Sequence, residues 1–182
     1  MTKDVLVSIS GLHMEGFPGV TEEENEAIEV VTPGSYYCKN GKHYIIYDEV
    51  MEGIPGTIKN KIKITGSDTV EIMKTGLSNT HMIFEKNKKN LTYYQTPYGQ
   101  MLIGVKTRNM EINVTEDDID VSVDYELDVN YEPLADCKIK MEIRAKGSDP
   151  FALHFLIIQN SVPKRVRPPF WQQYFAGGGL YF

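Results

Sequence analysis

Apolar and polar residues alternate along most of the first 146 residues, and this alternation restricts the chain to a few folds. The two clearest runs are 119–127 and 139–145, where every second residue is apolar and the residues between are polar or charged. A strand with this pattern buries one face and exposes the other, as strands of antiparallel sheets commonly do. Shorter alternating runs occupy residues 5–10, 44–51, 57–64 and 110–115. The pattern therefore predicts an all-β protein.

Turn signals separate these runs. Asn40-Gly41 predicts a tight hairpin because both residues accept positive φ angles. We count ten or eleven candidate strands before Gly147 and find no convincing helical period, although residues 22–28 could form one turn of helix. Many short, sequential strands favour an antiparallel up-and-down barrel of about 8–10 strands, because closure removes exposed sheet edges. A β-sandwich is the alternative that the sequence leaves open.

The composition changes at Gly147. Residues 147–182 carry one acidic and three basic side chains, a net charge of +2, and hold eight of the nineteen aromatic residues. The first 146 residues then carry −8, because the whole chain carries −6. We therefore divide the chain into a β-barrel domain, 1–146, and a C-terminal extension, 147–182, rich in aromatic residues, proline and glycine. The extension is interpreted as an appendage outside the barrel that could lack regular order.

Charge and hydropathy argue against several classes of partner. A net charge of −6 and an isoelectric point near 5.3 disfavour a nucleic-acid partner bound through its phosphates. No apolar run reaches the roughly 18 residues that a membrane helix needs, so no membrane partner is expected. The N-terminus resembles no secretory signal, and Cys38 and Cys137 are too few for a disulfide framework. We expect a cytoplasmic protein with free thiols.

A series of spaced motifs in the first 146 residues resembles a bacterial family of unknown function, DUF1934, the YwiB-like proteins. Each motif is short, and the resemblance depends on their order and spacing. The motifs are Gly34-Ser-Tyr36-Tyr37, Tyr44-Ile-Ile-Tyr47-Asp-Glu49, Thr57-Ile58-Lys59 with Ile62-Lys63, Val70-Glu-Ile-Met-Lys74-Thr-Gly76, Met82-Ile-Phe84, Thr96-Pro-Tyr-Gly99 with Ile103-Gly-Val-Lys-Thr107, and Val123-Asp-Tyr125-Glu-Leu127.

The resemblance implies a calycin-like, lipocalin-like β-barrel. It implies no catalytic residues, because the family carries no established activity. Barrels of this kind often hold a small apolar ligand, which is an analogy at the level of the fold. Family members usually stop near the strand at 138–144, so the extension departs from the family pattern.

Common catalytic and metal-binding patterns are missing from the sequence. His13, His43, His81 and His154 are scattered, with no spacing that would bring ligands together on one metal ion. There is no Gly-x-Ser-x-Gly nucleophile elbow, and the glycines at 177–179 lack the lysine of a phosphate-binding loop. We therefore predict no metal, no cofactor and no catalytic residue.

One alternating strand places an acid on an apolar face. Glu49 shares its face with Ile45 and Tyr47, so an inward-facing strand would put a carboxylate inside the barrel. A buried carboxylate would need a partner, such as Lys74, Tyr36 or a ligand. The alternative, which we favour because acids are rarely buried, is that Glu49 lies in water at the mouth of the barrel.

Three functional hypotheses follow. The first is a non-enzymatic cytoplasmic barrel that binds a small, partly apolar molecule in its interior. The predicted ligand-binding residues are Tyr36, Tyr47, Glu49, Lys74, Phe84 and Tyr125. The second is a protein-interaction module or homodimer with a core filled by side chains. The third is an enzyme that uses Glu49 as an acid or base.

Overall fold

The computed structural model describes residues 2–14, 28–50, 56–76, 79–96 and 99–146, and these residues form ten β-strands. The strands are β1 (Thr2–Met14), β2 (Ile28–Lys39), β3 (Lys42–Val50), β4 (Thr57–Thr65), β5 (Thr69–Thr75), β6 (Thr80–Glu85), β7 (Lys89–Thr96), β8 (Gly99–Val114), β9 (Asp118–Val129) and β10 (Glu132–Ala145). No helix occurs in these ranges. The helical turn considered at 22–28 lies outside the described residues except for Ile28, which begins β2.

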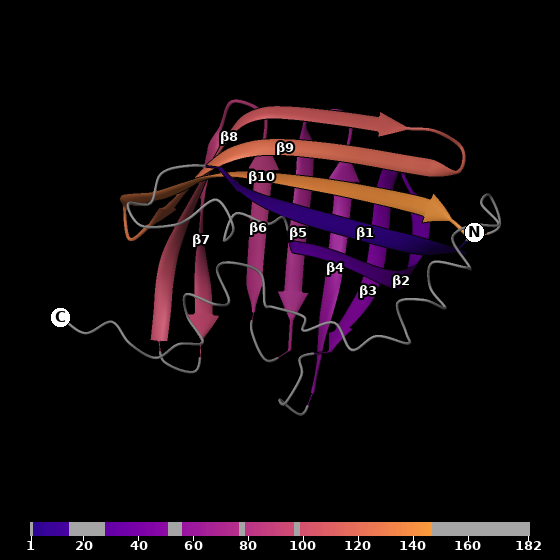
Figure 1. Cartoon of the computed structure of the whole chain (residues 1–182), viewed down its shortest axis with the longest axis horizontal. Helices are drawn as coiled ribbons and strands as arrows, with labels where there is room; N and C mark the ends of the chain where they lie inside the picture. Colours follow the sequence, from indigo (N-terminus) through magenta and orange to yellow (C-terminus); the bar gives the residue numbers. More distant parts are fainter. Residues whose placement is uncertain (1, 15–27, 51–55, 77–78, 97–98, 147–182) are drawn as a thin grey trace.

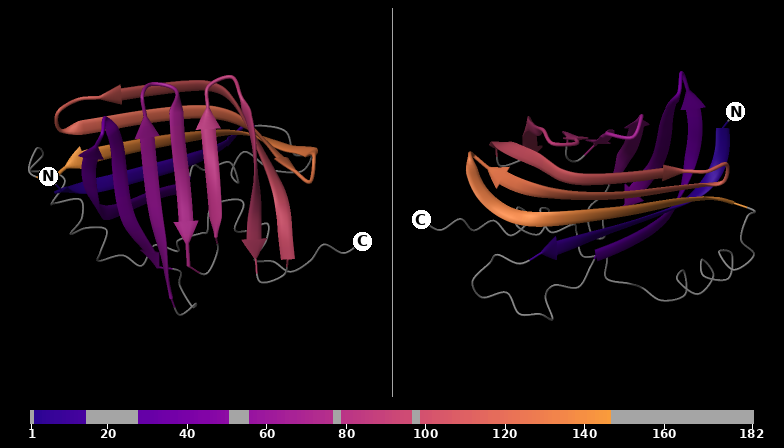
Figure 2. Two further views of the ribbon diagram at one scale, coloured as in Figure 1. Left: turned by 180° about the vertical axis from the view of Figure 1, so that it is seen from behind. Right: turned by 90° about the horizontal axis from the view of Figure 1, so that it is seen from above.

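The ten strands form one sheet in the order β6-β5-β4-β3-β2-β1-β10-β9-β8-β7. Each ladder joins antiparallel strands, and the first strand pairs with the last, Val7 lying opposite Ile143. The sheet curves around a common interior into a nearly closed barrel (Figures 1 and 2). The prediction of an antiparallel up-and-down barrel is therefore confirmed.

The barrel is incomplete between β6 and β7. No ladder of backbone hydrogen bonds joins these two strands in the described part of the chain. They meet at the turn that follows Glu85, where the backbone amide of Lys88 donates to the Glu85 carbonyl over 3.0 Å. Beyond the turn, the side-chain amide of Asn90 donates to the Ile83 carbonyl over 3.2 Å. β6 and β7 are consequently the two edge strands of the sheet.

Alternation along the strands produces the core. In β9, Ile119, Val121, Val123, Tyr125 and Leu127 are all buried, as the sequence predicts. Their neighbours in β1 and β10, including Val7, Met141 and Ile143, fill the same interior. Each of these side chains removes its apolar surface from water, which is the main favourable term in folding.

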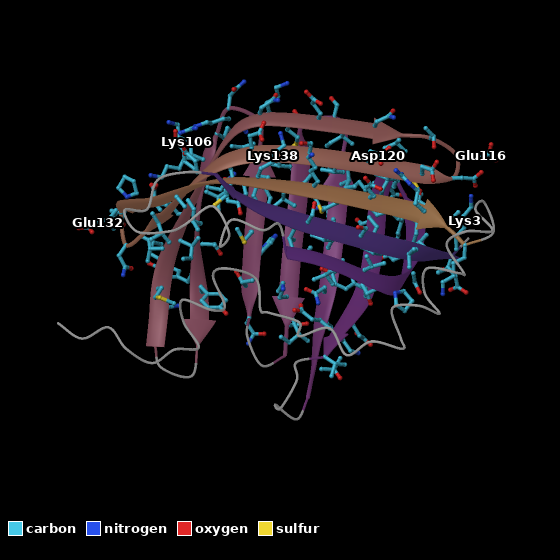
Figure 3. All side chains as sticks on the ribbon, viewed as in Figure 1. Lys3, Lys106, Glu116, Asp120, Glu132 and Lys138 are labelled. Carbon is cyan, nitrogen blue, oxygen red and sulfur yellow. The ribbon has the colours of Figure 1, made fainter. Side chains whose placement is uncertain are left out.

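Charged side chains cover the outer face. Figure 3 shows Lys106, Asp120 and Lys138 on β8, β9 and β10. The Lys138 ammonium lies 3.0 Å from the Asp124 carboxylate, and Arg144 lies 2.6 Å from Asp120. Asp120 and Asp124 on β9 are therefore paired with basic side chains on β10, as expected for cross-strand pairs.

The extension 147–182 lies outside the described residues, so its predicted order is not tested. Within the described ranges, no helix has the length and apolar character required to cross a membrane.

Candidate functional site

Four polar side chains lie side by side on the inner face of β3, β4, β5 and β6. Tyr47 is opposite Asn60, Asn60 is opposite Lys74, and Lys74 is opposite Thr80. Residues directly opposite each other in a sheet share a face, and all four side chains are buried. Glu49 lies two residues beyond Tyr47 and therefore on the same face. We call these five residues the polar cluster.

The polar cluster lies near one end of the barrel. β3 ends at Val50 and β5 ends at Thr75, while β4 begins at Thr57 and β6 begins at Thr80. Because neighbouring strands run antiparallel, these four termini gather at the same end, at the lower edge of the barrel in Figure 1. The cluster is thus only a few residues from these strand ends.

Glu49 and Lys74 form an ion pair inside the barrel. The Lys74 Nζ lies 3.0 Å from the Glu49 Oε2, and the two side chains are only 8% and 11% exposed, respectively. The Asn60 Nδ2 donates to the same Glu49 oxygen over 3.3 Å. The carboxylate is therefore held by two donors and is largely withdrawn from water. This finding supports the inward-facing interpretation of Glu49 over its placement in water.

Asn60 is fully buried, and only one of the two polar atoms of its side chain forms hydrogen bonds. Its Nδ2 donates to Glu49 and also to the backbone carbonyl of Ile58, over 3.3 Å. Its Oδ1 accepts no hydrogen bond. Leaving a buried acceptor without a donor costs about 1–3 kcal/mol. Asn60 Oδ1 is therefore the point in the cluster where an additional donor would be most stabilising.

Tyr47 keeps its proton at neutral pH. Burial raises the pKa of its hydroxyl well above the ordinary range, and the negative charge of Glu49 raises it further. A phenol held neutral in this way can donate or accept a hydrogen bond but supplies no charge. The only charges in the polar cluster therefore belong to the Glu49–Lys74 pair.

Tyr36 lies elsewhere in the barrel and does not pair with Glu49. It lies opposite Ile45, and its hydroxyl lies 2.9 Å from the Nδ1 of His43. Glu49 is four residues further along β3, about 13 Å away at the usual rise of a strand. Burial is the main cause that raises the pKa of Tyr36, and the nearby Cys38 raises it further.

Phe84 and Tyr125 pack against each other in the apolar core. Their ring centroids are 5.1 Å apart with the rings at 73°, an edge-to-face arrangement. Burial raises the pKa of Tyr125, and burial also raises the pKa of the neighbouring Cys137 thiol to about 11. Cys137 therefore stays a protonated thiol at neutral pH.

The six predicted site residues thus divide into three groups. Tyr47, Glu49 and Lys74 belong to the polar cluster, Phe84 and Tyr125 belong to the core, and Tyr36 pairs with His43. The sequence analysis missed Asn60 and Thr80. Asn60 carries a detectable signal, because it interrupts an apolar face that otherwise reads Ile58, Ile62, Ile64. No group of three potential metal ligands occurs in the described part of the chain.

Comparison with known proteins agrees with this architecture. The chain is 25% identical over 107 residues to the uncharacterized β-barrel protein YwiB of Bacillus subtilis (strain 168), a match that covers 59% of this chain and 73% of the relative. The crystal structure of the ywiB protein from Bacillus subtilis superimposes with a TM-score of 0.66 at 17% identity. That superposition covers 79% of this chain and 92% of the other, and it shows a shared fold.

The family model with the description "Domain of unknown function (DUF1934)" matches residues 13–141. This range includes most of the barrel and the whole polar cluster. The predicted resemblance is thereby confirmed, and the chain belongs to the DUF1934 family.

Proposed function

We propose that this protein binds a small, partly apolar molecule inside the barrel, with the polar part of that molecule against the polar cluster. The observation that carries the proposal is the fully buried Asn60 Oδ1, which accepts no hydrogen bond. Buried polar groups in folded proteins almost always have a partner, so an exception calls for an explanation. A donor on a bound molecule would satisfy Asn60.

The location of the polar cluster supports the proposal. It lies beside the apolar side chains of Ile58 and Ile62 and close to the strand ends at one end of the barrel. Binding sites commonly combine an apolar wall with a few convergent polar groups in this way. A barrel with ten strands is also wider than the eight-stranded barrels that hold one small ligand. Since Phe84 and Tyr125 already fill the middle, the molecule would have to be small.

The free cysteines support a cytoplasmic setting for this function. Cys38 on β2 and Cys137 on β10 are both free thiols. Thiols persist in this form in a reducing compartment.

Native mass spectrometry of the freshly purified full chain tests the proposal. We expect an adduct of small mass that disappears on denaturation and is strongly reduced in Asn60→Leu. The matched control is Asn113→Leu, because Asn113 is an exposed asparagine on β8. If the wild-type chain retains no molecule, and no compound in a fragment screen raises its melting temperature, the proposal is wrong.

A second candidate function is self-association through the edge strand β7. Leu91 and Tyr93 lie on the outer face of this strand and are 53% and 61% exposed. An exposed apolar pair on an unpaired edge offers both main-chain and side-chain contacts to a second copy. Light scattering should then give a dimer mass for the wild type and a monomer mass for Leu91→Lys/Tyr93→Lys. Val114→Lys, at an exposed valine on β8, is the control and should remain dimeric.

A further inference from the structure

We infer that the molecule bound at the polar cluster presents an uncharged hydrogen-bond donor, such as a hydroxyl or a primary amide, to the Asn60 Oδ1. The inference rests on the proposed function and narrows it to a chemical class of ligand. It follows from the charges already present in the cluster and from the kind of hydrogen-bonding group left open there.

The charges of the polar cluster already cancel. Lys74 and Glu49 neutralise each other at 3.0 Å, while Tyr47, Asn60 and Thr80 are uncharged. These side chains are largely withdrawn from water, so a further charge would lose its hydration without a counter-charge to replace it. A neutral polar group avoids this cost.

The group left open in the polar cluster is an acceptor. Asn60 Oδ1 accepts nothing, although it is fully buried. The Glu49 Oε2, by contrast, accepts from both Lys74 and Asn60. A ligand must therefore bring N–H or O–H groups, which a hydroxyl or a primary amide supplies.

The same arrangement disfavours the two charged alternatives. A carboxylate would bring more acceptors to Asn60 Oδ1, and its negative charge would repel Glu49. An alkylammonium would compete with Lys74 for Glu49 and leave an excess positive charge beside Lys74. Only a neutral donor satisfies the open acceptor and leaves the existing ion pair unchanged.

Isothermal titration calorimetry of the full chain at pH 7 tests this inference with four probes of equal chain length. Octan-1-ol and octanamide are neutral donors, whereas octanoate is anionic and octylamine is cationic at this pH. We expect each neutral probe to bind at least about tenfold more tightly than each charged one, which is the effect of a single hydrogen bond to a buried group. Asn60→Leu should abolish this preference, and Asn113→Leu should keep it.

The possible failures are distinguishable. Binding of octanoate or octylamine as tight as that of the neutral probes would overturn the ligand class and leave the proposed function standing. Preference for the neutral probes that survives Asn60→Leu would also overturn the inference. If none of the four probes binds, the inference is wrong, and the proposed function falls with it only if native mass spectrometry shows no retained molecule.

Discussion

At the scale of single residues, Glu49 and Lys74 depend on each other. Both side chains are about nine-tenths buried, so removal of one leaves the other as an uncompensated charge in the barrel interior. We expect Lys74→Met to lower the free energy of unfolding by about 3–5 kcal/mol. The double variant Glu49→Gln/Lys74→Met should lower the free energy of unfolding by less than Lys74→Met alone, because it buries no unpaired charge. Urea denaturation of the three proteins measures both quantities.

An exposed ion pair provides the control. The Lys106 Nζ lies 3.1 Å from the Glu126 Oε2, and the two side chains are 53% and 29% exposed. Lys106→Met should therefore lower the free energy of unfolding by less than about 1 kcal/mol. If the double variant at Glu49 and Lys74 is destabilised as much as Lys74→Met alone, or more, the pair is not coupled as described.

Residue-level reasoning from the sequence found part of the site. Period-two alternation placed Glu49 on the same face as Ile45 and Tyr47, because that period fixes side-chain direction. The interpretation favoured from the sequence, Glu49 in water at the mouth of the barrel, was wrong, because its side chain is only 11% exposed and pairs with Lys74. The suggestion that Tyr36 could pair with Glu49 was wrong. The Asn40-Gly41 turn sets Lys39 opposite Lys42, which places Tyr36 opposite Ile45 and far from Glu49. The open acceptor of Asn60 depends on side-chain rotamers across three strands, which no local pattern encodes.

At the scale of the strands, Gly34 on β2 allows a close approach that a larger residue would prevent. A Cβ at Gly34 would lie 2.9 Å from the Ile46 carbonyl oxygen on β3 and 2.9 Å from the Val7 Cγ2 on β1. Gly34→Ala should therefore lower the free energy of unfolding by about 1–3 kcal/mol through overpacking. The change in the midpoint of urea or thermal unfolding measures this cost.

Gly11 on β1 is the matched control. A Cβ there would meet no atom within 4 Å. Gly11→Ala should leave stability unchanged or raise it by up to about 1 kcal/mol, because alanine gives up less chain entropy on folding. Equal effects at Gly34 and Gly11 would contradict the steric explanation.

Strand faces were easier to predict than strand ends. The whole inner face of β9 was correctly predicted from its alternation. The last strand, by contrast, shows alternation in the sequence only over 139–145 but begins at Glu132. A register shift between Pro133 and Ala135 breaks the period of two at that point, so the alternation becomes readable only beyond it.

At the scale of the whole molecule, the described part of the chain ends where the residue after β10 forms a backbone hydrogen bond to β1. β10 ends at Ala145, and the Lys146 amide donates to the Asp4 carbonyl on β1 over 3.0 Å. All the buried core residues named here precede this point. We expect a chain truncated after Lys146 to keep the β-sheet circular dichroism spectrum and to melt within a few degrees of the full chain. A fall of more than about 10 °C would mean that 147–182 contributes to the stability of the barrel.

Three buried acids also predict how the stability of the barrel depends on alkaline pH. Burial raises the pKa of Cys137 to about 11, and it raises those of Tyr47 and Tyr125 above their ordinary range. In the unfolded chain a cysteine titrates near about 8.5 and a tyrosine near about 10. Above these values the unfolded chain loses its protons before the folded one does. The stability contributed by these three groups is therefore fully present below about pH 8.5 and is lost as the pH rises.

Cys137→Ala separates the contribution of the thiol from that of the tyrosines. Between pH 8 and pH 11, wild type should lose about 2–3 kcal/mol more unfolding free energy than this variant, the linkage expected for a thiol shifted to about pH 11. Cys38→Ala, which removes the exposed thiol, is the matched control variant. Urea denaturation at each pH under reducing conditions measures the free energy of unfolding. Only its change with pH is compared between the proteins, so the constant loss from the cavity left by alanine does not affect the result. Equal slopes for wild type and Cys137→Ala would show that the Cys137 thiol ionises as readily in the folded barrel as in the unfolded chain.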